Sequence, residues 1–252
     1  MLACCVKHQV PRFLGKWVKG GFLVTMLAGS ALITAMSLAY FDFETLPPFV
    51  IEKLPVRFEA LWLASLRTHV AAAAVSFPLC LALMTRMLQR RAVWHRWIGR
   101  VTGVVVLCGL VPTGIVLSFD AKGGRIVTAG FLLSAAIVAF SMVYGVRAAR
   151  RRELPSHARA MRHIVGQMSV AVVSRALIIG LDAVGVDPDL AYVVALWGPV
   201  LASVAAVEFV SRQAFWNRKR IPFVERIHRA LTPLAPIVRA RGLVRSLARP
   251  GR

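Results

Sequence analysis

The sequence predicts an all-α fold, a polytopic transmembrane helical bundle of about six spans with both the N and C termini cytoplasmic. Hydrophobic residues make up 58% of the 252 residues and charged residues 17%, which is too apolar for a soluble domain of this length. Several apolar runs reach the ~20 residues that a spanning helix needs. These runs are long and uninterrupted rather than alternating, which favours helices over a membrane barrel.

A basic leader, residues 1–20, precedes the first predicted span at residues 21–40. Its basic residues are expected to keep it on the cytoplasmic side, because positively charged flanks are retained there. A small-x-small pattern at Ser37 and Ala39 leaves a cleaved signal peptide as an alternative, although the apolar run exceeds the usual ~7 to 15 residues.

The second predicted span covers residues 60–87 and contains Pro78, which we expect to kink the helix. The residues before it, 41–59, are rich in proline and acidic side chains and predict an exterior loop. An acid-free interior loop follows, with the arginines Arg86, Arg90, Arg91, Arg96 and Arg100.

Four further spans are predicted at residues 101–118, 126–146, 164–183 and 190–211. The exterior turns between them contain glycines in one case and aspartates in the other. The interior loop between the fourth and fifth spans is rich in arginine, with Glu153 as its one acidic residue. Every loop assigned to the inside is therefore basic and every other loop is acidic or mixed, as the positive-inside bias requires.

Tryptophans mark the expected membrane boundaries, where interfacial aromatic residues are enriched. The inner boundary is marked by Trp17, Trp94, Trp97 and Trp216. Trp62 lies near the outer boundary, whereas Trp197 lies deeper and is expected to pack inside the bundle.

Small residues predict where helices pack closely. Gly99 and Gly103 form a small-xxx-small step in the third span, and Ala71 to Ala74 give the second span a thin face. We expect neighbouring backbones to approach one another at these positions.

The last region, residues 212–252, is a basic cytoplasmic tail. Apolar residues and arginines are mixed through residues 218–247, and Pro222, Pro233 and Pro236 are expected to interrupt any single helix there. This composition predicts a segment that rests on anionic lipid, with a disordered tail as the alternative. The chain thus divides into a leader at 1–20, a transmembrane domain at 21–211 and a tail at 212–252.

The formal net charge of +21 would suggest a nucleic-acid partner in a soluble protein. Here the basic residues lie between and after the apolar segments. We therefore expect contact with the lipid bilayer, with anionic headgroups at the basic loops and tail, and no nucleic acid. The absence of a phosphate-binding glycine loop, a Ser-His-Asp order, an HExxH motif and paired CxxC motifs argues against hydrolases and nucleotide-driven enzymes.

Ionisable residues within membrane spans are costly, so each one is a candidate functional residue. The candidates inside spans are His69, Arg175 and Glu208. The candidates at or before the inner ends of the third and fifth spans are His95, His157 and His163.

Helix geometry sorts four of these residues into two pairs. His157 and Arg175 are five whole turns apart and share a helix face, but ~27 Å separates them along the axis, so they cannot form one compact site. His95 and His157 both precede spans that leave the inner interface, so these two could meet. His69 and Arg175 both lie in the outer half of the membrane and could also meet.

Each pair suggests a chemistry. Two facing histidines could ligate haem iron or another metal, whereas a His-Arg pair in hydrocarbon could hold a carboxylate or a haem propionate. The predicted cofactor-binding residues are His69, His95, His157 and Arg175, with His163 in reserve, and no catalytic residue is predicted.

Structural roles are the alternatives for each of these residues. His69 could be a neutral imidazole hydrogen-bonded across helices, and Arg175 could pair with Asp182 or with carbonyls. His95 and His157 could be interfacial polar residues without a ligand.

Several of these residues also resemble a known pattern. His69, the run His-Arg-Trp-Ile-Gly-Arg at residues 95–100, His157 with Met161-Arg162, and Arg175 look like a bacterial family of predicted membrane proteins, known as domain of unknown function 2306. The resemblance covers residues 61–208 and departs from the family at Ala160, where an aromatic residue is expected. It implies a bacterial cytoplasmic (inner) membrane location and no established activity.

A looser similarity to four-helix haem b membrane proteins lies in histidines that recur near helix starts. It is an analogy of fold and does not transfer function. The leading hypothesis is a multi-pass protein that binds b-type haem, or another ligand, in its second to fifth helices for redox work. The alternatives are a non-enzymatic transporter or lipid- or anion-binding protein, and a purely structural or assembly factor.

Overall fold

The computed structural model describes residues 12–42, 45 and 47–231. Within these residues all regular secondary structure is helical, and six helical segments are long and apolar enough to cross a membrane. The predicted all-α fold with six spans is therefore confirmed. The candidate spans are Lys19–Phe41, Glu59–Leu83, Ala92–Ser118, Gly124–Arg150, Leu154–Ala183 and Pro188–Gln213.

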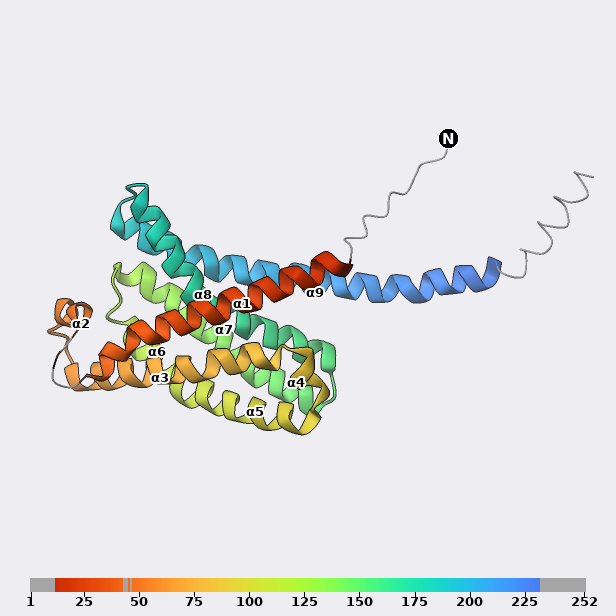
Figure 1. Cartoon of the computed structure of the whole chain (residues 1–252), viewed down its shortest axis with the longest axis horizontal. Coiled ribbons are helices and arrows are strands. Elements are labelled where there is room, and N and C mark those ends of the chain that lie inside the picture. The colour runs from red at the N-terminus through yellow and green to blue at the C-terminus, as the bar shows by residue number, and fades with distance from the viewer. Residues whose placement is uncertain (1–11, 43–44, 46, 232–252) are drawn as a thin grey trace, which may run out of the picture. The chain divides into compact units, whose positions relative to one another are not determined.

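Each predicted span corresponds to one of these segments, with shifted ends (Figure 1). The helices, in chain order, are α1 (Arg12–Ser37) with the 3-10 turn η1 (Leu38–Phe41), α2 (Pro48–Lys53), α3 (Glu59–Leu83), α4 (Arg86–Arg90), α5 (Ala92–Val104), the π-helical segment η2 (Val105–Leu110), α6 (Val111–Ser118), α7 (Gly124–Arg150), α8 (Leu154–Ala183) and α9 (Pro188–Leu231). The third span begins at Ala92 instead of residue 101, so His95 lies within its helix.

The chain forms two compact units, residues 1–205 and residues 206–252. The helix α9 has residues in both units and continues through Pro222 to Leu231, so the prediction that this proline interrupts the helix is wrong. A proline within a helix removes one hydrogen bond and bends the helix, which does not always end it. Residues 232–252, with Pro233 and Pro236, lie outside the described residues.

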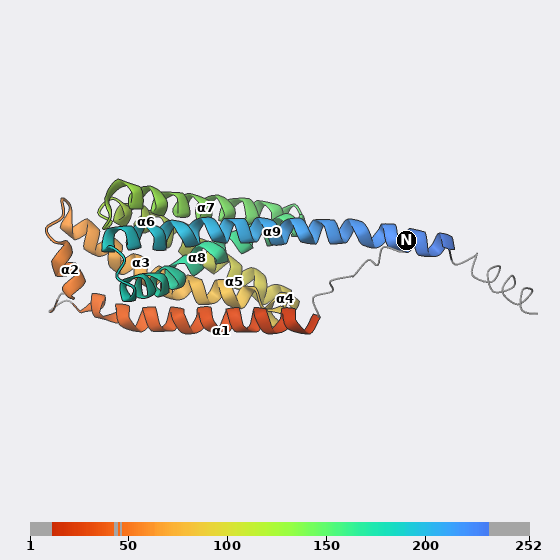
Figure 2. The same ribbon diagram turned by 90° about the horizontal axis from the view of Figure 1, so that it is seen from above.

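The main hydrophobic core of the first unit joins α3, the third span, α7 and α8. Its most deeply buried members include Phe77, Leu81, Val106, Met142 and Ile164. The helix α1 contributes Met26 and packs along α3 at the periphery of the bundle (Figure 2). A second cluster, formed by Val127, Val170, Leu196 and Val200, joins α7, α8 and α9.

Small residues do set the closest helix crossings, but not all at the predicted positions. A Cβ on Gly109 would lie 3.1 Å from the Cβ of Ala72, so the thin face of α3 packs on η2 as expected. A Cβ on Gly145 would lie 3.0 Å from the Cβ of buried Ala160, which shows that α7 and α8 cross there. Gly99 faces open space, so its predicted packing role is wrong.

The third span contains a π-helical segment that hydropathy does not reveal. The N–H of Val111 donates to the carbonyl of Val106, five residues earlier, instead of four. Pro112 follows directly and lacks the N–H that an α-helix would use at that position, which is a common cause of local irregularity in a helix. Leu110, the last residue of the segment, and Thr113 of α6 lie against His69 of α3.

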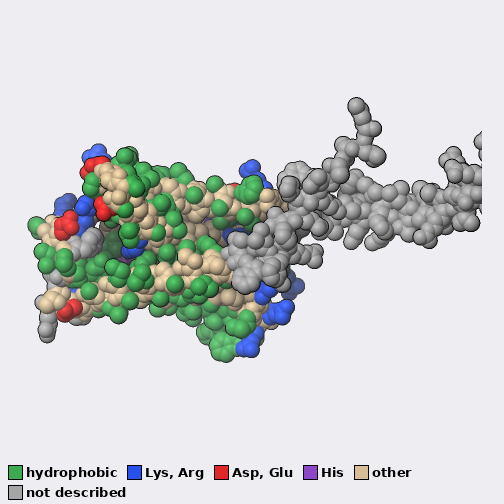
Figure 3. Space-filling view, turned by 45° about the horizontal axis from the view of Figure 1, so that its top comes forward, with side chains coloured by type: hydrophobic (Ala, Val, Ile, Leu, Met, Phe, Trp, Pro, Cys, Tyr) green, Lys and Arg blue, Asp and Glu red, His purple; other side chains and the backbone are tan. Residues whose placement is uncertain are grey.

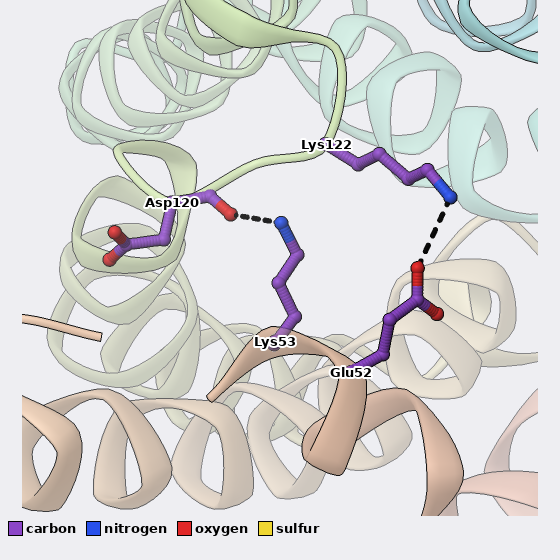
Figure 4. A network of polar contacts seen from close by, with 4 residues as sticks. All are labelled: Glu52, Lys53, Asp120 and Lys122. Carbon is purple, nitrogen blue, oxygen red and sulfur yellow. Dashed lines mark hydrogen bonds and ion pairs between the residues drawn. The ribbon is translucent and has the colours of Figure 1, made fainter. Parts of the chain in front are cut away.

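The predicted exterior loop at residues 41–59 contains the short helix α2. Lys53 Nζ donates to the carbonyl of Asp120 at 2.7 Å, and Lys122 Nζ lies 3.4 Å from Glu52 Oε1, so both lysines tie α2 to the turn between α6 and α7 (Figure 4). Trp62 is only 4% exposed in a cluster with Val50 of α2, so this tryptophan packs within the protein near the start of α3.

Acidic side chains gather at one end of the bundle (Figure 3). Most Asp and Glu side chains visible in Figure 3 gather at the end that carries α2, and hydrophobic side chains cover the sides. The other end, formed by the end of α3, by α4 and by the starts of α5 and α8, is termed the basic end. It carries the arginines of the loops at residues 84–91 and 147–153.

Candidate functional site

His95 and His157 lie side by side at the basic end. His95 is the fourth residue of α5 and His157 the fourth residue of α8. Their ring centroids are 6.5 Å apart and the ring planes are inclined by 82°, an edge-to-face contact. The structure therefore brings together the pair that the sequence placed at one depth.

The two imidazoles differ in how they are held. His157 Nδ1 lies 2.9 Å from the carbonyl oxygen of Gly145, and because a carbonyl only accepts, this ring nitrogen donates. In the neutral ring Nε2 then keeps a free lone pair, the arrangement that metal-ligating histidines use. The Nδ1 of His95 is buried and has no hydrogen-bond partner among the described residues.

His69 lies on α3 against the π-helical segment. Its Nδ1 is 3.1 Å from the carbonyl of Leu110 and 3.2 Å from Thr113 Oγ1. Gly114 leaves room for the ring, because a Cβ there would lie 3.0 Å from His69 Cε1. The hydrogen bonds across helices are those expected of a structural imidazole, and they leave Nε2 as the acceptor of the neutral ring.

Arg175 lies on α8 in the half of the bundle away from the basic end, with an exposed side chain. Its Nη1 donates to the carbonyl of Ala171 at 2.8 Å, and no carboxylate pairs with it in the part of the chain that the structure describes. The alternative of a pairing with Asp182 is therefore wrong, and the alternative of bonding to carbonyls is confirmed.

The structure also brings His69 and Arg175 to one depth. His69 is ten residues from the start of α3, ~15 Å along the axis, and Arg175 is eight residues from the end of α8, ~12 Å. The helices α3 and α8 are in contact. The two predicted pairs are thus separate sites, at opposite ends of α8.

Two further candidates stand apart from these pairs. His163 lies on α8, six residues after His157, and is half-buried. Glu208 is on the part of α9 that belongs to the second unit. Within the described residues, no three His, Cys, Asp or Glu side chains gather as a metal site, so a metal at His95 and His157 would need further ligands from a cofactor or solvent.

Gln167 is a buried polar residue that the sequence reasoning missed. It lies on α8 and is 4% exposed; its Oε1 accepts from Ser134 of α7 at 2.8 Å. Its Nε2 donates to Ser203 Oγ at 2.9 Å and to the carbonyl of Val200 at 3.2 Å, both on α9. An uncharged amide in an apolar run was the available signal, because such side chains hydrogen-bond across membrane helices.

Arg67 was missed in the same way. It lies on α3, and its Nε donates to the carbonyl of Tyr40 at 2.8 Å, which ties α3 to the end of the first span. This contact gives the side chain a structural role.

Comparison with known families gives one match. The model of a family described as Predicted membrane protein (DUF2306) matches residues 66–211, more than half of the chain. These residues include all six candidates His69, His95, His157, His163, Arg175 and Glu208. No curated protein and no solved structure matches the chain.

Proposed function

Since the chain belongs to the predicted membrane protein family DUF2306, a family without an assigned activity, we propose a function from its residues alone: a multi-pass protein that binds b-type haem through His95 and His157. The single observation that supports the proposal is the meeting of these two imidazoles at the starts of α5 and α8. A bacterial cytoplasmic membrane, with the basic end inside, is part of the proposal.

The spacing of the rings fits ligation of one metal atom. Two imidazoles that ligate one metal atom, with ~2 Å per metal–nitrogen bond, would have ring centres no more than about 6 Å apart. The observed centroid separation is 6.5 Å. In the edge-to-face arrangement, one ring must turn for both to ligate one metal.

His95 is the ring that can turn. The hydrogen bond to Gly145 holds His157, whereas no partner within the described residues fixes His95 Nδ1. The ring torsion of histidine has broad energy wells, so a rotation costs little. Bound haem would supply a one-electron carrier. The two histidines would hold its iron, and Gly145 would set the tautomer of His157.

A visible spectrum of the purified full-length protein tests this proposal. We expect a Soret band and a positive pyridine haemochrome assay, with haem lost in both His95→Ala and His157→Ala. His69→Asn is the matched control, because the amide can keep the hydrogen bond to Leu110 and leaves the proposed iron ligands in place. A wild-type protein without a Soret band would refute the proposal.

The second candidate function is binding of an anionic group by Arg175 and His69. Arg175 is exposed within a span, and among the described residues only one of its donors is used, on a carbonyl of its own helix. A guanidinium has five N–H donors, so a carboxylate or phosphate can still be held bidentately. His157 and Arg175 are ~27 Å apart along α8. Arg175 and His69 would therefore not contact the propionates of a haem held by His95 and His157.

An amphiphilic anion, such as a fatty acid, or a lipid headgroup is the class of ligand expected there. Binding of a spin-labelled fatty acid to the reconstituted protein should fall in Arg175→Gln and persist in His95→Ala. Equal binding by wild type and Arg175→Gln would contradict this candidate.

The orientation can be tested independently of any ligand. Reporter fusions at residues 90 and 150 and at the C terminus should all be cytoplasmic, because arginine-rich connections stay inside. A fusion at either loop on the opposite side from the C terminus would contradict the topology and the cytoplasmic position of the haem site. Anionic headgroups at the basic loops are the lipid partners that this orientation favours.

A further inference from the structure

A shallow apolar groove of about 520 Å³ lies beside the start of the third span, on α3 and α5. Its lining residues are Leu79, Val93, Trp94, Trp97, Ile98 and Val101. Trp94 and Trp97 are 59% and 60% exposed, so two large aromatic side chains lie open along this groove. Five of the six lining residues are on α5, where they share one face that does not include His95. Neither histidine of the pair lines the groove.

Basic residues flank the start of α5, which forms one end of the groove. Arg91 directly precedes α5, Arg86 and Arg90 lie on α4 just before it, and all three are exposed. No carboxylate pairs with any of them among the described residues. Guanidinium groups without a carboxylate partner among the described residues therefore lie next to the residues of α5 that begin the apolar groove.

We propose that this groove binds one anionic glycerophospholipid, with an acyl chain along Trp97 and Val101 and the phosphate at Arg90 and Arg91. The charge beside the start of α5 is complementary to an anionic headgroup, and the tryptophans sit at the level where aromatic rings meet lipid headgroups. Arginine binds phosphate oxygens bidentately. A zwitterionic headgroup is expected to bind less well, because its own cation competes with the arginine for the phosphate. The proposal holds whether or not haem is bound.

Quenching by brominated lipids tests the proposal on the full chain. The protein is reconstituted into phosphatidylcholine vesicles that contain increasing fractions of either brominated phosphatidylglycerol or brominated phosphatidylcholine. The fluorescence signal of Trp94 and Trp97 is obtained as the difference in tryptophan fluorescence between the wild type and the double variant Trp94→Phe/Trp97→Phe. We expect brominated phosphatidylglycerol to quench that signal at a several-fold lower lipid fraction than brominated phosphatidylcholine.

Paired variants locate the charge that gives the preference. Arg90→Gln/Arg91→Gln should lower the preference for phosphatidylglycerol on the order of tenfold, since each basic residue near the surface contributes to anionic lipid binding. Arg150→Gln/Arg151→Gln, two exposed arginines in the other loop of the basic end, is the matched control and should leave it unchanged. An equal loss of the preference for phosphatidylglycerol in both double variants would overturn the proposal, because it would show a diffuse effect of charge instead of binding at the groove.

Salt gives a second readout that needs no substitution in the protein. The preference should decline as ionic strength rises from ~0.01 M to ~1 M, because the Debye length shortens from about 30 Å to 3 Å. Equal quenching of the wild type by the two lipids, or quenching by neither because a second copy covers the groove, would overturn the proposal.

Discussion

Replacing Gln167 by leucine is expected to weaken the bundle by about 2 kcal/mol. The side chain makes three hydrogen bonds, to Ser134, Ser203 and the carbonyl of Val200. Hydrogen bonds between membrane helices contribute ~0.6 kcal/mol each on average, so the three together contribute about 2 kcal/mol. Leucine fills a similar volume, so the cavity term stays small.

The partners of Gln167 limit the loss. Ser203 Oγ already lies 2.9 Å from the carbonyl of Val200, and serine hydroxyls in helices can bond to carbonyls of their own helix. The freed hydroxyls therefore keep an acceptor. Gln167→Ala also removes packing atoms from a buried site, and we expect it to cost a further ~1 to 3 kcal/mol.

The free energy of unfolding in detergent micelles is the measurement. Gln89→Leu is the matched control, because Gln89 is exposed and bonds the carbonyls of Leu83 and Met84 at 3.3 Å. It should change stability by no more than ~0.5 kcal/mol. Gln167→Leu with wild-type stability, or a control that costs as much, would show that this amide does not hold α7, α8 and α9 together.

Two further predictions concern helix contacts. A Cβ on Gly29 would lie 2.5 Å from Cγ1 of Val172, whose β-branched side chain has one preferred rotamer in a helix, so Gly29→Ala should lower the unfolding free energy by ~1 to 3 kcal/mol. Gly21→Ala meets open space and should be neutral or stabilising in the same measurement of unfolding free energy in detergent micelles. Glu52→Gln breaks the exposed ion pair with Lys122, and a loss above ~1 kcal/mol in chemical denaturation would contradict the weak contribution expected of it.

The histidine pair shows how far sequence alone could lead. Helix periodicity and depth placed His95 and His157 at one level, because two helices that start at the same interface present equivalent residues at equal depth. Periodicity and depth do not predict which face each helix turns towards its neighbour. The tight crossing of α7 and α8 at Gly145 and Ala160 accompanies the orientation of His157 towards its carbonyl partner.

Tertiary context also decided the features that were missed. Gln167 is one polar residue in an apolar run, and only the positions of Ser134 and Ser203 on two other helices show its role. Trp62 matched an interfacial anchor by depth, yet α2 folds over it and buries it. Hydropathy averages over a window and carries no information on which side chain faces which.

The sequence by itself determined that the chain is a six-span helical membrane protein, because the length of apolar runs is set by the thickness of a bilayer and is a local property. The DUF2306 match agrees with that class. Only the tertiary structure decided that His95 meets His157, that His69 rests on a π-helical segment and that Arg175 has no carboxylate partner among the described residues. Those facts depend on how helices are rotated against one another, and packing between distant segments sets that rotation.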